Sequence, residues 1–333
     1  MQQFIDSILK SNRRLAMPVM THPGIEALGY TVKQAVSDGN IQYKAIKYIA
    51  DKYDTIACMA MMDLTVEAEA FGAKINLPDH EIPTVSERLL ADAEAIDALQ
   101  VPSLEAGRIP QYLLANKLAA ENIKHKPVFS GCIGPFSLAG RLYDMSEIMV
   151  AIYIEPDAML QLLTKCTEFL IEYCKALKAT GTQGVIMAEP AAGLLSNDEC
   201  QSYSTDFVKQ IVDAVQDDSF TVILHNCGNT GQCTQAMVAS GARGLHFGNA
   251  IDMEQVLTEC PSDVIVMGNL NPVGVFKQGS VDSVKIETKA LLAKVGSHPN
   301  FVISSGCDLP PFVPEENIQA FLDAVANMTP NLR

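Results

Sequence analysis

Short apolar segments alternate along the chain with longer segments in which apolar residues recur every three or four positions. The short segments are often β-branched and are bounded by Gly, Pro, Asn or Asp, which is typical of strands buried in a parallel sheet. Eight strands are predicted in this way, at residues 17–22, 55–63, 126–131, 184–189, 221–225, 244–248, 264–268 and 301–305.

The longer segments predict helices. In residues 156–177 the apolar side chains lie at alternating spacings of four and three, which places them on one face of a helix. A similar stripe follows Pro314. Eight strand–helix units predict an α/β fold, a closed (β/α)8 TIM barrel, because each helical crossover returns to a parallel strand. A doubly wound open sheet is the alternative, although no G-x-G-x-x-G follows the first predicted strand.

One unit of the predicted barrel is oversized. About sixty residues separate Asp63 from Lys126, and we interpret them as an extended excursion over the barrel mouth after the second strand. Neither edge of this segment has a linker rich in Gly, Ser or Pro. We therefore expect a single barrel domain over residues 1–333.

Composition narrows the class of protein. The chain has 333 residues and a formal net charge of −15, which disfavours binding to nucleic acid or to an anionic membrane surface, since both depend on Lys and Arg. No apolar run is long enough to span a bilayer, and residues 1–14 do not have the pattern of a secretory signal. The 9 scattered cysteines indicate a reduced, cytoplasmic protein.

Soft metal ligands lie at the ends of two predicted strands. The fifth strand ends at His225, with Cys227 two residues on, and the eighth is followed by Cys307. Because the ends of barrel strands share one rim, we expect these three side chains to meet. One His and two Cys leave the fourth position of a tetrahedral zinc ion open, as in catalytic zinc sites. The alternative is that both cysteines pack as small hydrophobic residues.

Other polar residues lie at the same rim. Asp63 and Glu189 end the second and fourth predicted strands, and we predict catalytic roles for them as carboxylates that carry protons or orient the substrate. His22, Asn249 and Asn269 are predicted to contact the substrate. Capping a turn is the alternative for Asp63. Glu189 has the alternative of filling the open zinc position when substrate is absent. Structural roles are the alternative for Glu189 and the other three.

The remaining candidates favour packing or solvation. Cys58, Cys132, Cys166, Cys174 and Cys200 lie within or next to predicted strands and helices, so we expect them to be buried without function. Cys233 is predicted to lie in the helix after the fifth strand, where ligation is disfavoured. His246 is expected to be a core histidine, and His80, His125 and His298 are expected to be solvated.

Several stretches resemble a known family, the uroporphyrinogen decarboxylase (URO-D) superfamily, and within it the zinc-dependent methylcobamide:coenzyme M methyltransferases. They are MDLTVEAEAFG at residues 62–72, GPFSLA at 134–139, GNLNP at 268–272, the His225-x-Cys227-Gly228 pair and SGCD at 305–308. The resemblance implies a (β/α)8 barrel and implies that His225, Cys227 and Cys307 bind zinc. Asn271 replaces the usual Asp of the third stretch.

The resemblance also implies an activity, which is methyl transfer from a methylcobalamin-type corrinoid, held on a corrinoid-carrying partner protein, to a small thiol such as coenzyme M. Porphyrinogen decarboxylation is the alternative, and Asp63 aligns with the catalytic Asp of the decarboxylases. However, the arginine-rich loop of the decarboxylases is replaced by residues 21–30, which contain no Arg, and the chain has only seven arginines. A polycarboxylate substrate is therefore difficult to hold. A non-catalytic module that docks a corrinoid protein or stores metal is a third possibility.

Overall fold

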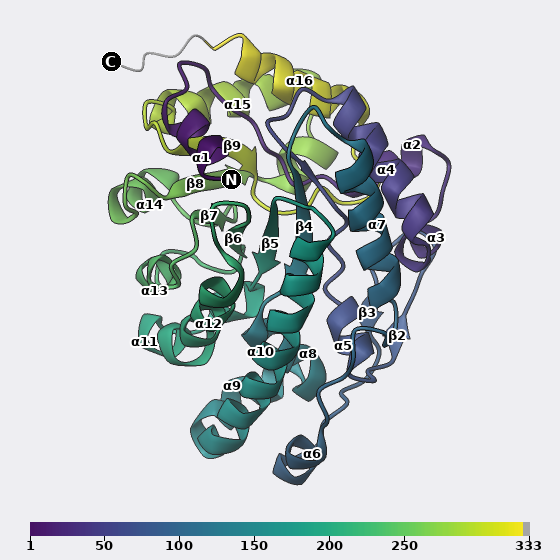
Figure 1. Cartoon of the computed structure of the whole chain (residues 1–333). Coiled ribbons are helices and arrows are strands. Elements are labelled where there is room, and N and C mark those ends of the chain that lie inside the picture. The colour runs from purple at the N-terminus through teal and green to yellow at the C-terminus, as the bar shows by residue number, and fades with distance from the viewer. Residues whose placement is uncertain (329–333) are drawn as a thin grey trace.

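The computed structural model describes residues 1–328 and shows a curled parallel sheet with helices around it (Figure 1). Residues 329–333, the end of the predicted domain, lie outside the described part of the chain. Within residues 1–328 the sheet has seven strands, and each neighbouring pair is parallel. In sheet order they are β1 (Cys58–Met59), β4 (Val128–Ile133), β5 (Gly184–Ala188), β6 (Thr221–Asn226), β7 (Gly244–Phe247), β8 (Ile265–Leu270) and β9 (Phe301–Ser305).

Helices precede, link and follow these strands. In chain order they are α1 (Gln2–Leu9), α2 (His22–Ala27), α3 (Val32–Ser37), α4 (Gly39–Lys52), α5 (Val66–Ala70), α6 (Ala93–Ala98), α7 (Ile109–Asn122), α8 (Pro135–Tyr143), α9 (Met145–Ile154), α10 (Pro156–Ala179), η1 (Pro190–Leu194), α11 (Asn197–Cys200), η2 (Gln201–Thr205), α12 (Asp206–Val215), α13 (Thr234–Ala239), α14 (Met253–Glu259), η3 (Pro272–Lys277), α15 (Val281–Val295) and α16 (Glu315–Ala326). The two helices predicted from their apolar stripes correspond to α10 and α16. None of the helices in the described residues is long and apolar enough to cross a membrane.

The first predicted strand is the main departure from the predicted barrel. Residues 17–22 form no regular strand. The chain pairs with β9 only through an isolated parallel bridge just before them, from Ala16 to Ile303. The Met17 N–H donates to the Ile303 carbonyl over 3.0 Å, and the Ile56 N–H donates to the Ala16 carbonyl over 3.1 Å. Pro18 then interrupts the ladder because proline has no N–H to donate. This segment therefore closes the barrel without forming a regular strand.

Apolar side chains from alternate strand positions fill the interior of the barrel. Phe129, Ile186, Ile223 and Val302 belong to one buried cluster, which Ile5 and Ile8 of α1 complete. The Gln2 N–H donates to the carbonyl of Asp218, in the loop before β6, over 3.4 Å. Helix α1 therefore covers the amino-terminal end of the barrel, the end opposite to the rim on which the strands terminate.

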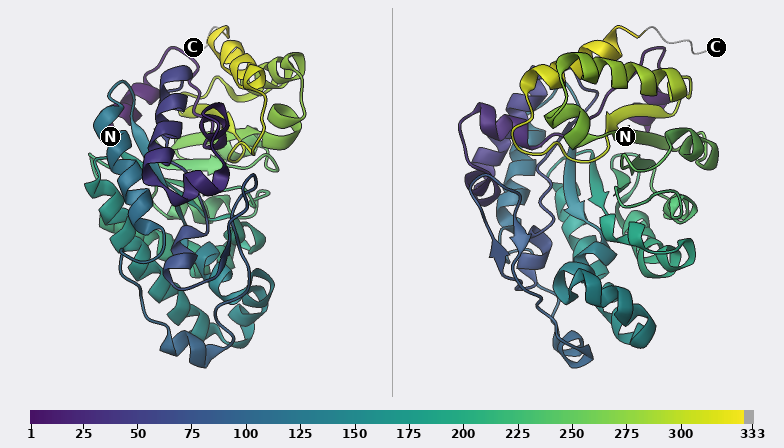
Figure 2. Two further views of the ribbon diagram at one scale, coloured as in Figure 1. Left: turned by 90° about the vertical axis from the view of Figure 1, so that its right-hand side faces the viewer. Right: turned by 180° about the vertical axis from the view of Figure 1, so that it is seen from behind.

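The oversized unit contains α5, α6, α7 and a small antiparallel hairpin of β2 (Ile75–Asn76) and β3 (Thr84–Val85). Lys165 of α10 donates hydrogen bonds of 2.7–2.8 Å to three carbonyl groups at the end of α6, and Leu89 and Leu90 bond to the carbonyl of Leu142 in α8. In both views of Figure 2, α6 and the end of α9 lie far from α16. The predicted position of this segment over the barrel mouth stays a prediction.

Candidate metal centre

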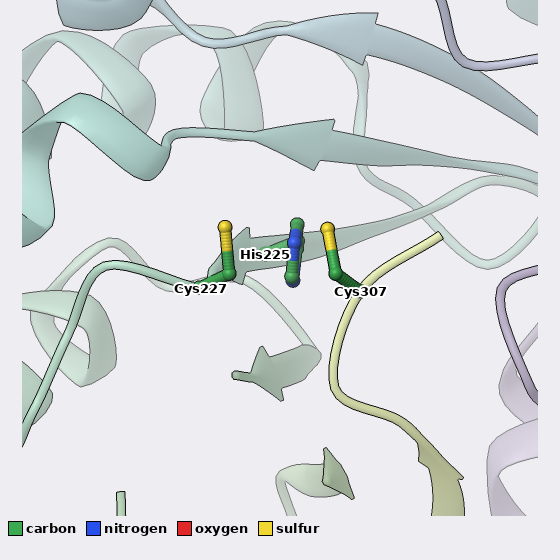
Figure 3. Close-up of side chains that lie close together, drawn as sticks. All are labelled: His225, Cys227 and Cys307. Atoms are coloured by element: carbon green, nitrogen blue, oxygen red, sulfur yellow. The ribbon is translucent and has the colours of Figure 1, made fainter. Parts of the chain in front are cut away.

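Three of the predicted site residues converge on one point. His225 is on β6, Cys227 follows that strand, and Cys307 follows β9. Their ligand atoms, one imidazole nitrogen and two sulfur atoms, all lie within 4.8 Å of one another. Figure 3 shows the two sulfur atoms on either side of the imidazole ring. Since β7 and β8 separate β6 from β9 in the sheet, it is the curl of the barrel that brings the two strand ends together.

The orientation of the His225 ring is set by hydrogen bonds inside the barrel. Its Nδ1 lies 2.7 Å from Nδ1 of His246, on the neighbouring strand β7. The other nitrogen of His246, Nε2, lies 2.9 Å from Oγ of Ser304, and the Ser304 hydroxyl donates to the carbonyl of Met17 over 2.8 Å. All three side chains are buried. A chain of three hydrogen bonds therefore runs from His225 across the barrel to Met17.

The direction of these hydrogen bonds fixes the tautomer of His225. The Ser304 hydroxyl has one proton, which it donates to Met17, so it accepts from Nε2 of His246. Burial and the neighbouring His225 ring lower the pKa of His246 well below its ordinary value, so His246 is neutral and its Nδ1 is an acceptor. The proton between the two rings consequently belongs to Nδ1 of His225. Its Nε2 carries the free lone pair.

This lone pair is the observation that bears most directly on metal binding. Nε2 of His225 is buried and has no hydrogen-bond partner among residues 1–328. A buried acceptor without a partner costs about 1–3 kcal/mol, and a metal ion removes that cost. A tetrahedral zinc ion holds ligand sulfur and nitrogen at about 2.3 and 2.0 Å, which is compatible with the spacing of these three atoms. The residues present therefore fit zinc.

The two thiols also favour a cation between them. Their shared hydrogen bond lowers the pKa of Cys227 and raises that of Cys307. Divalent zinc stabilises both thiolates, since the thiolate is the form of cysteine that binds metal.

Close approach of the backbone explains the glycines beside the two cysteines. A Cβ at Gly228 would lie 2.5 Å from the carbonyl oxygen of Pro190, and a Cβ at Gly306 would lie 2.7 Å from the amide nitrogen of Asn249. Any larger residue would push these loops apart. The glycines thus let the loops after β5 and β6, and those after β7 and β9, approach each other closely beside the ligands.

His22 lies beside the Cys307 loop. It is buried, and its Nδ1 is 3.1 Å from the carbonyl oxygen of Leu309 and 3.5 Å from Oδ2 of Asp308. Asp308 also accepts from the amide and the hydroxyl of Thr21 over 3.1 and 2.5 Å. These contacts join the segment after residue 20 to the loop that carries Cys307. The substrate contact predicted for His22 stays a prediction.

Glu189 is buried at the amino terminus of α8. Its carboxylate accepts hydrogen bonds from the amides of Phe136 and Ser137 over 2.7 and 2.8 Å and from the hydroxyl of Ser204 over 3.0 Å. Burial raises its pKa, and the hydrogen bonds from Ser137, Phe136 and Ser204 oppose that rise. Both carboxylate oxygens are occupied in this way, so the geometry supports an anchoring role. The predicted acid–base role stays a prediction.

Asp63 is at the centre of a buried polar cluster. Its Oδ2 accepts from Arg108 over 2.6 Å and from the Tyr112 hydroxyl over 3.0 Å. Its Oδ1 accepts from the amide and hydroxyl of Thr65. Arg108 also pairs with Glu69 over 2.6 Å. These contacts agree with the alternative that Asp63 caps the turn beneath it. The catalytic role of Asp63 stays a prediction.

The two predicted asparagines line one cavity of about 380 Å³, outside the ends of β7 and β8. Asn269 donates from its amide group to the carbonyls of Gly248 and Ile251 over 2.9 and 2.8 Å, so it holds the loop after β7. Asn249 is exposed. Contact of either residue with the substrate stays a prediction.

Sequence reasoning missed four residues at or near the rim. The sequence does not predict the pairing of Arg108 with Asp63. A core position for His246 does not by itself indicate its contact with His225. Burial raises the pKa of Glu67 to about 8, and its Oε2 has no hydrogen-bond partner among residues 1–328. Arg141 lines a cavity at the rim. In a chain with so few arginines, Arg108 and Arg141 were the available signals.

The other cysteines lie outside the cluster, as predicted. Cys233 is buried, and its thiol donates to the carbonyls of Ala192 and Leu195 over 3.4 and 3.3 Å. The sulfur atoms of Cys132 and Cys174 are 3.9 Å apart, and both are buried in the apolar core.

Comparison with known proteins places this chain in a family. The family model described as uroporphyrinogen decarboxylase (URO-D) matches residues 13–328. The chain therefore belongs to the URO-D family.

Relatives within the family include both methyltransferases and decarboxylases. Methylcobamide:CoM methyltransferase MtbA of Methanosarcina mazei is 30% identical over 270 residues, which cover 80% of this chain and 78% of that protein. A uroporphyrinogen decarboxylase of Legionella pneumophila (strain Lens) is 25% identical over 291 residues, which cover 84% and 80%. A solved structure, a methyltransferase from Methanosarcina mazei, superposes with a TM-score of 0.87 at 23% identity and covers 97% of both chains. The resemblance to the methyltransferase branch is thus confirmed.

Proposed function

We propose that this protein is a zinc-dependent corrinoid methyltransferase, which moves a methyl group from a methyl-cobalt corrinoid on a partner protein to a small thiol such as coenzyme M. The observation that supports it best is the unpartnered Nε2 of His225 beside the thiols of Cys227 and Cys307. Three such ligands leave one position of a tetrahedral ion for a substrate. The names of the methyltransferase relatives support the corrinoid and the thiol.

The chemistry of the acceptor explains why a soft metal is useful. A free thiol has a pKa of about 8.5, and its thiolate is the nucleophile. Zinc, when bound, supplies a positive charge that stabilises the substrate thiolate at neutral pH. The thiolate sulfur attacks the methyl carbon, a sulfur–carbon bond forms, and the carbon–cobalt bond breaks. The electron pair of the broken bond would leave with the corrinoid, which is thereby reduced.

The residues of the chain supply position rather than covalent catalysis. His225, Cys227 and Cys307 would hold the zinc ion, and His246 keeps His225 in the tautomer that presents Nε2. Asp308 and His22 hold the Cys307 loop. For Asp63 and Glu189 we infer that they fix the rim around the substrate, since all four of their carboxylate oxygens already accept hydrogen bonds.

Decarboxylation of a porphyrinogen is less well supported. A polycarboxylate needs several free cations, preferably arginines. Arg108, at the rim, is already paired with Asp63 and Glu69.

Metal analysis tests the proposal. Wild-type protein is expected to bind one zinc ion per chain, and Cys307→Ala and His225→Ala are expected to lose it while circular dichroism shows an intact barrel. Cys260→Ala, the same chemical change at a buried cysteine outside the cluster, is the matched control and should retain zinc. Wild-type protein that remains free of zinc after zinc is supplied would overturn the proposal.

A further inference from the structure

A small cavity opens at the rim between the ends of β4 and β5. Ile133, Ser137 and Arg141 line one side of it, Pro190 and Leu194 of η1 line another, and its volume is about 220 Å³. Pockets for drug-sized ligands have volumes of about 300–1,000 Å³. This cavity therefore suits a much smaller molecule.

Arg141 is the one charged residue that lines this cavity. It is partly buried, and no residue among 1–328 forms a hydrogen bond or ion pair with it. Burial lowers its pKa, opposed only by the charge of Asp63. That carboxylate is already bound by Arg108 and Tyr112. A partly desolvated cation without a partner is costly, so the cavity favours an anion.

The cavity adjoins the candidate metal centre. The segment Pro190–Leu194, which forms one wall, also packs against the loop after Cys227. A Cβ at Gly193 would lie 2.2 Å from the carbonyl carbon of Gly228, and a Cβ at Gly228 would lie 2.5 Å from the Pro190 oxygen. The segment that lines this cavity is therefore in direct contact with the loop that carries Cys227.

We propose that Arg141 binds the anionic end of the thiol acceptor, a sulfonate or carboxylate, while the thiol end points to the metal centre. This inference rests on the proposed function, because it assigns the two ends of the same acceptor. Guanidinium binds such oxyanions through two parallel hydrogen bonds. The acceptor is therefore a small thiol acid, and a neutral thiol of the same size is a poor substrate.

Binding of a sulfonate without a thiol tests the cavity by itself. We expect ethanesulfonate to bind the metal-free wild-type protein, measured by calorimetric or NMR titration, and Arg141→Gln to weaken binding at least about tenfold, since hydrogen bonds to charged groups contribute about 1.5–3 kcal/mol. Arg141→Lys should lose less. Arg88→Gln, at an exposed arginine outside the cavity, is the control. Equal affinity of wild type and Arg141→Gln would overturn the inference.

Comparing the kinetics of two thiols tests whether the anion that Arg141 binds belongs to the acceptor. The ratio of kcat/KM for 2-mercaptoethanesulfonate over 2-mercaptoethanol should fall at least about tenfold in Arg141→Gln. An equal loss for both thiols would contradict the assignment. If wild type methylates neither thiol, the proposed function fails, whereas the ethanesulfonate titration still decides whether Arg141 forms an anion site.

Discussion

The two ring nitrogens of His225 have different roles: Nδ1 forms a hydrogen bond with His246, and Nε2 has the free lone pair. Residues outside the metal centre cause this difference. The hydroxyl of Ser304 and the ring of His246 together leave Nδ1 of His225 protonated. Such partners of a metal-binding histidine fix its tautomer and orient its ring. His246 is thus a positioning residue, although it lies wholly within the barrel.

Removing this partner should weaken metal binding. We expect His246→Leu to reduce zinc affinity about 10–100-fold, measured by competition with a chelator, while the exposed control His125→Leu leaves it unchanged. Nitrogen-15 NMR of metal-free wild-type protein should show His225 protonated at Nδ1. A mixture of both tautomers in wild type, or unchanged zinc affinity in His246→Leu, would show that the hydrogen-bond chain does not act on the ligand.

At the scale of elements, the rim is held together by carboxylates that join the end of one strand to a neighbouring strand–helix unit. Glu189 follows β5 but binds the first amides of α8, which belongs to the preceding strand–helix unit. Asp308 binds Thr21 across the closure of the barrel. Glu189 is buried and Asp308 is half-buried, and each fixes a loop that is next to a metal ligand.

The anchoring role of Glu189 predicts a loss of stability. In Glu189→Gln one acceptor oxygen becomes an amide group, which cannot accept from the Ser137 N–H. We expect the free energy of unfolding to fall by about 1–3 kcal/mol, measured by urea denaturation. If stability is unchanged and only turnover falls, Glu189 acts in acid–base catalysis instead, as the sequence analysis predicted.

Strands could be predicted from the sequence where a local run of apolar residues determines them. The strands from β4 to β9 lie within two residues of the predicted segments, because buried parallel strands are apolar runs bounded by turn residues. The first predicted strand fails as a regular strand because Pro18 interrupts its ladder. The apolar pattern of residues 17–22 correctly predicts that the segment is buried. It does not indicate that Pro18 lacks the N–H that a regular strand needs.

The site was predictable in part for a related reason. His225, Cys227 and Cys307 follow from the rule that parallel strands end at one rim. Asp63 is bound by Arg108 and Tyr112, and Glu189 by the amides of Phe136 and Ser137. These four partners are 45–53 residues away in sequence, and no local pattern specifies such contacts. The same holds for His246, whose alignment with His225 depends on the register of β6 and β7.

At the scale of the whole molecule, the two ends of the barrel differ in polarity. Helix α1 covers one end with apolar side chains. The rim at the other end holds the candidate metal ligands and Arg141, which has no partner within residues 1–328. The net charge of −15 does not prevent binding of a small anion, because a local cation outweighs distant charges. The barrel thereby concentrates its polar chemistry at one end.

A methyl-transfer assay with and without zinc most directly tests the proposal that this protein transfers a methyl group to a thiol. Methylcobalamin and 2-mercaptoethanesulfonate would be mixed without oxygen, with loss of methylcobalamin followed by absorbance and the S-methyl product by NMR. We predict transfer by zinc-loaded wild-type protein, loss of transfer after chelation, recovery when zinc is restored, and no carbon dioxide from uroporphyrinogen. Equal transfer by zinc-free protein, or decarboxylation of uroporphyrinogen, would contradict the account.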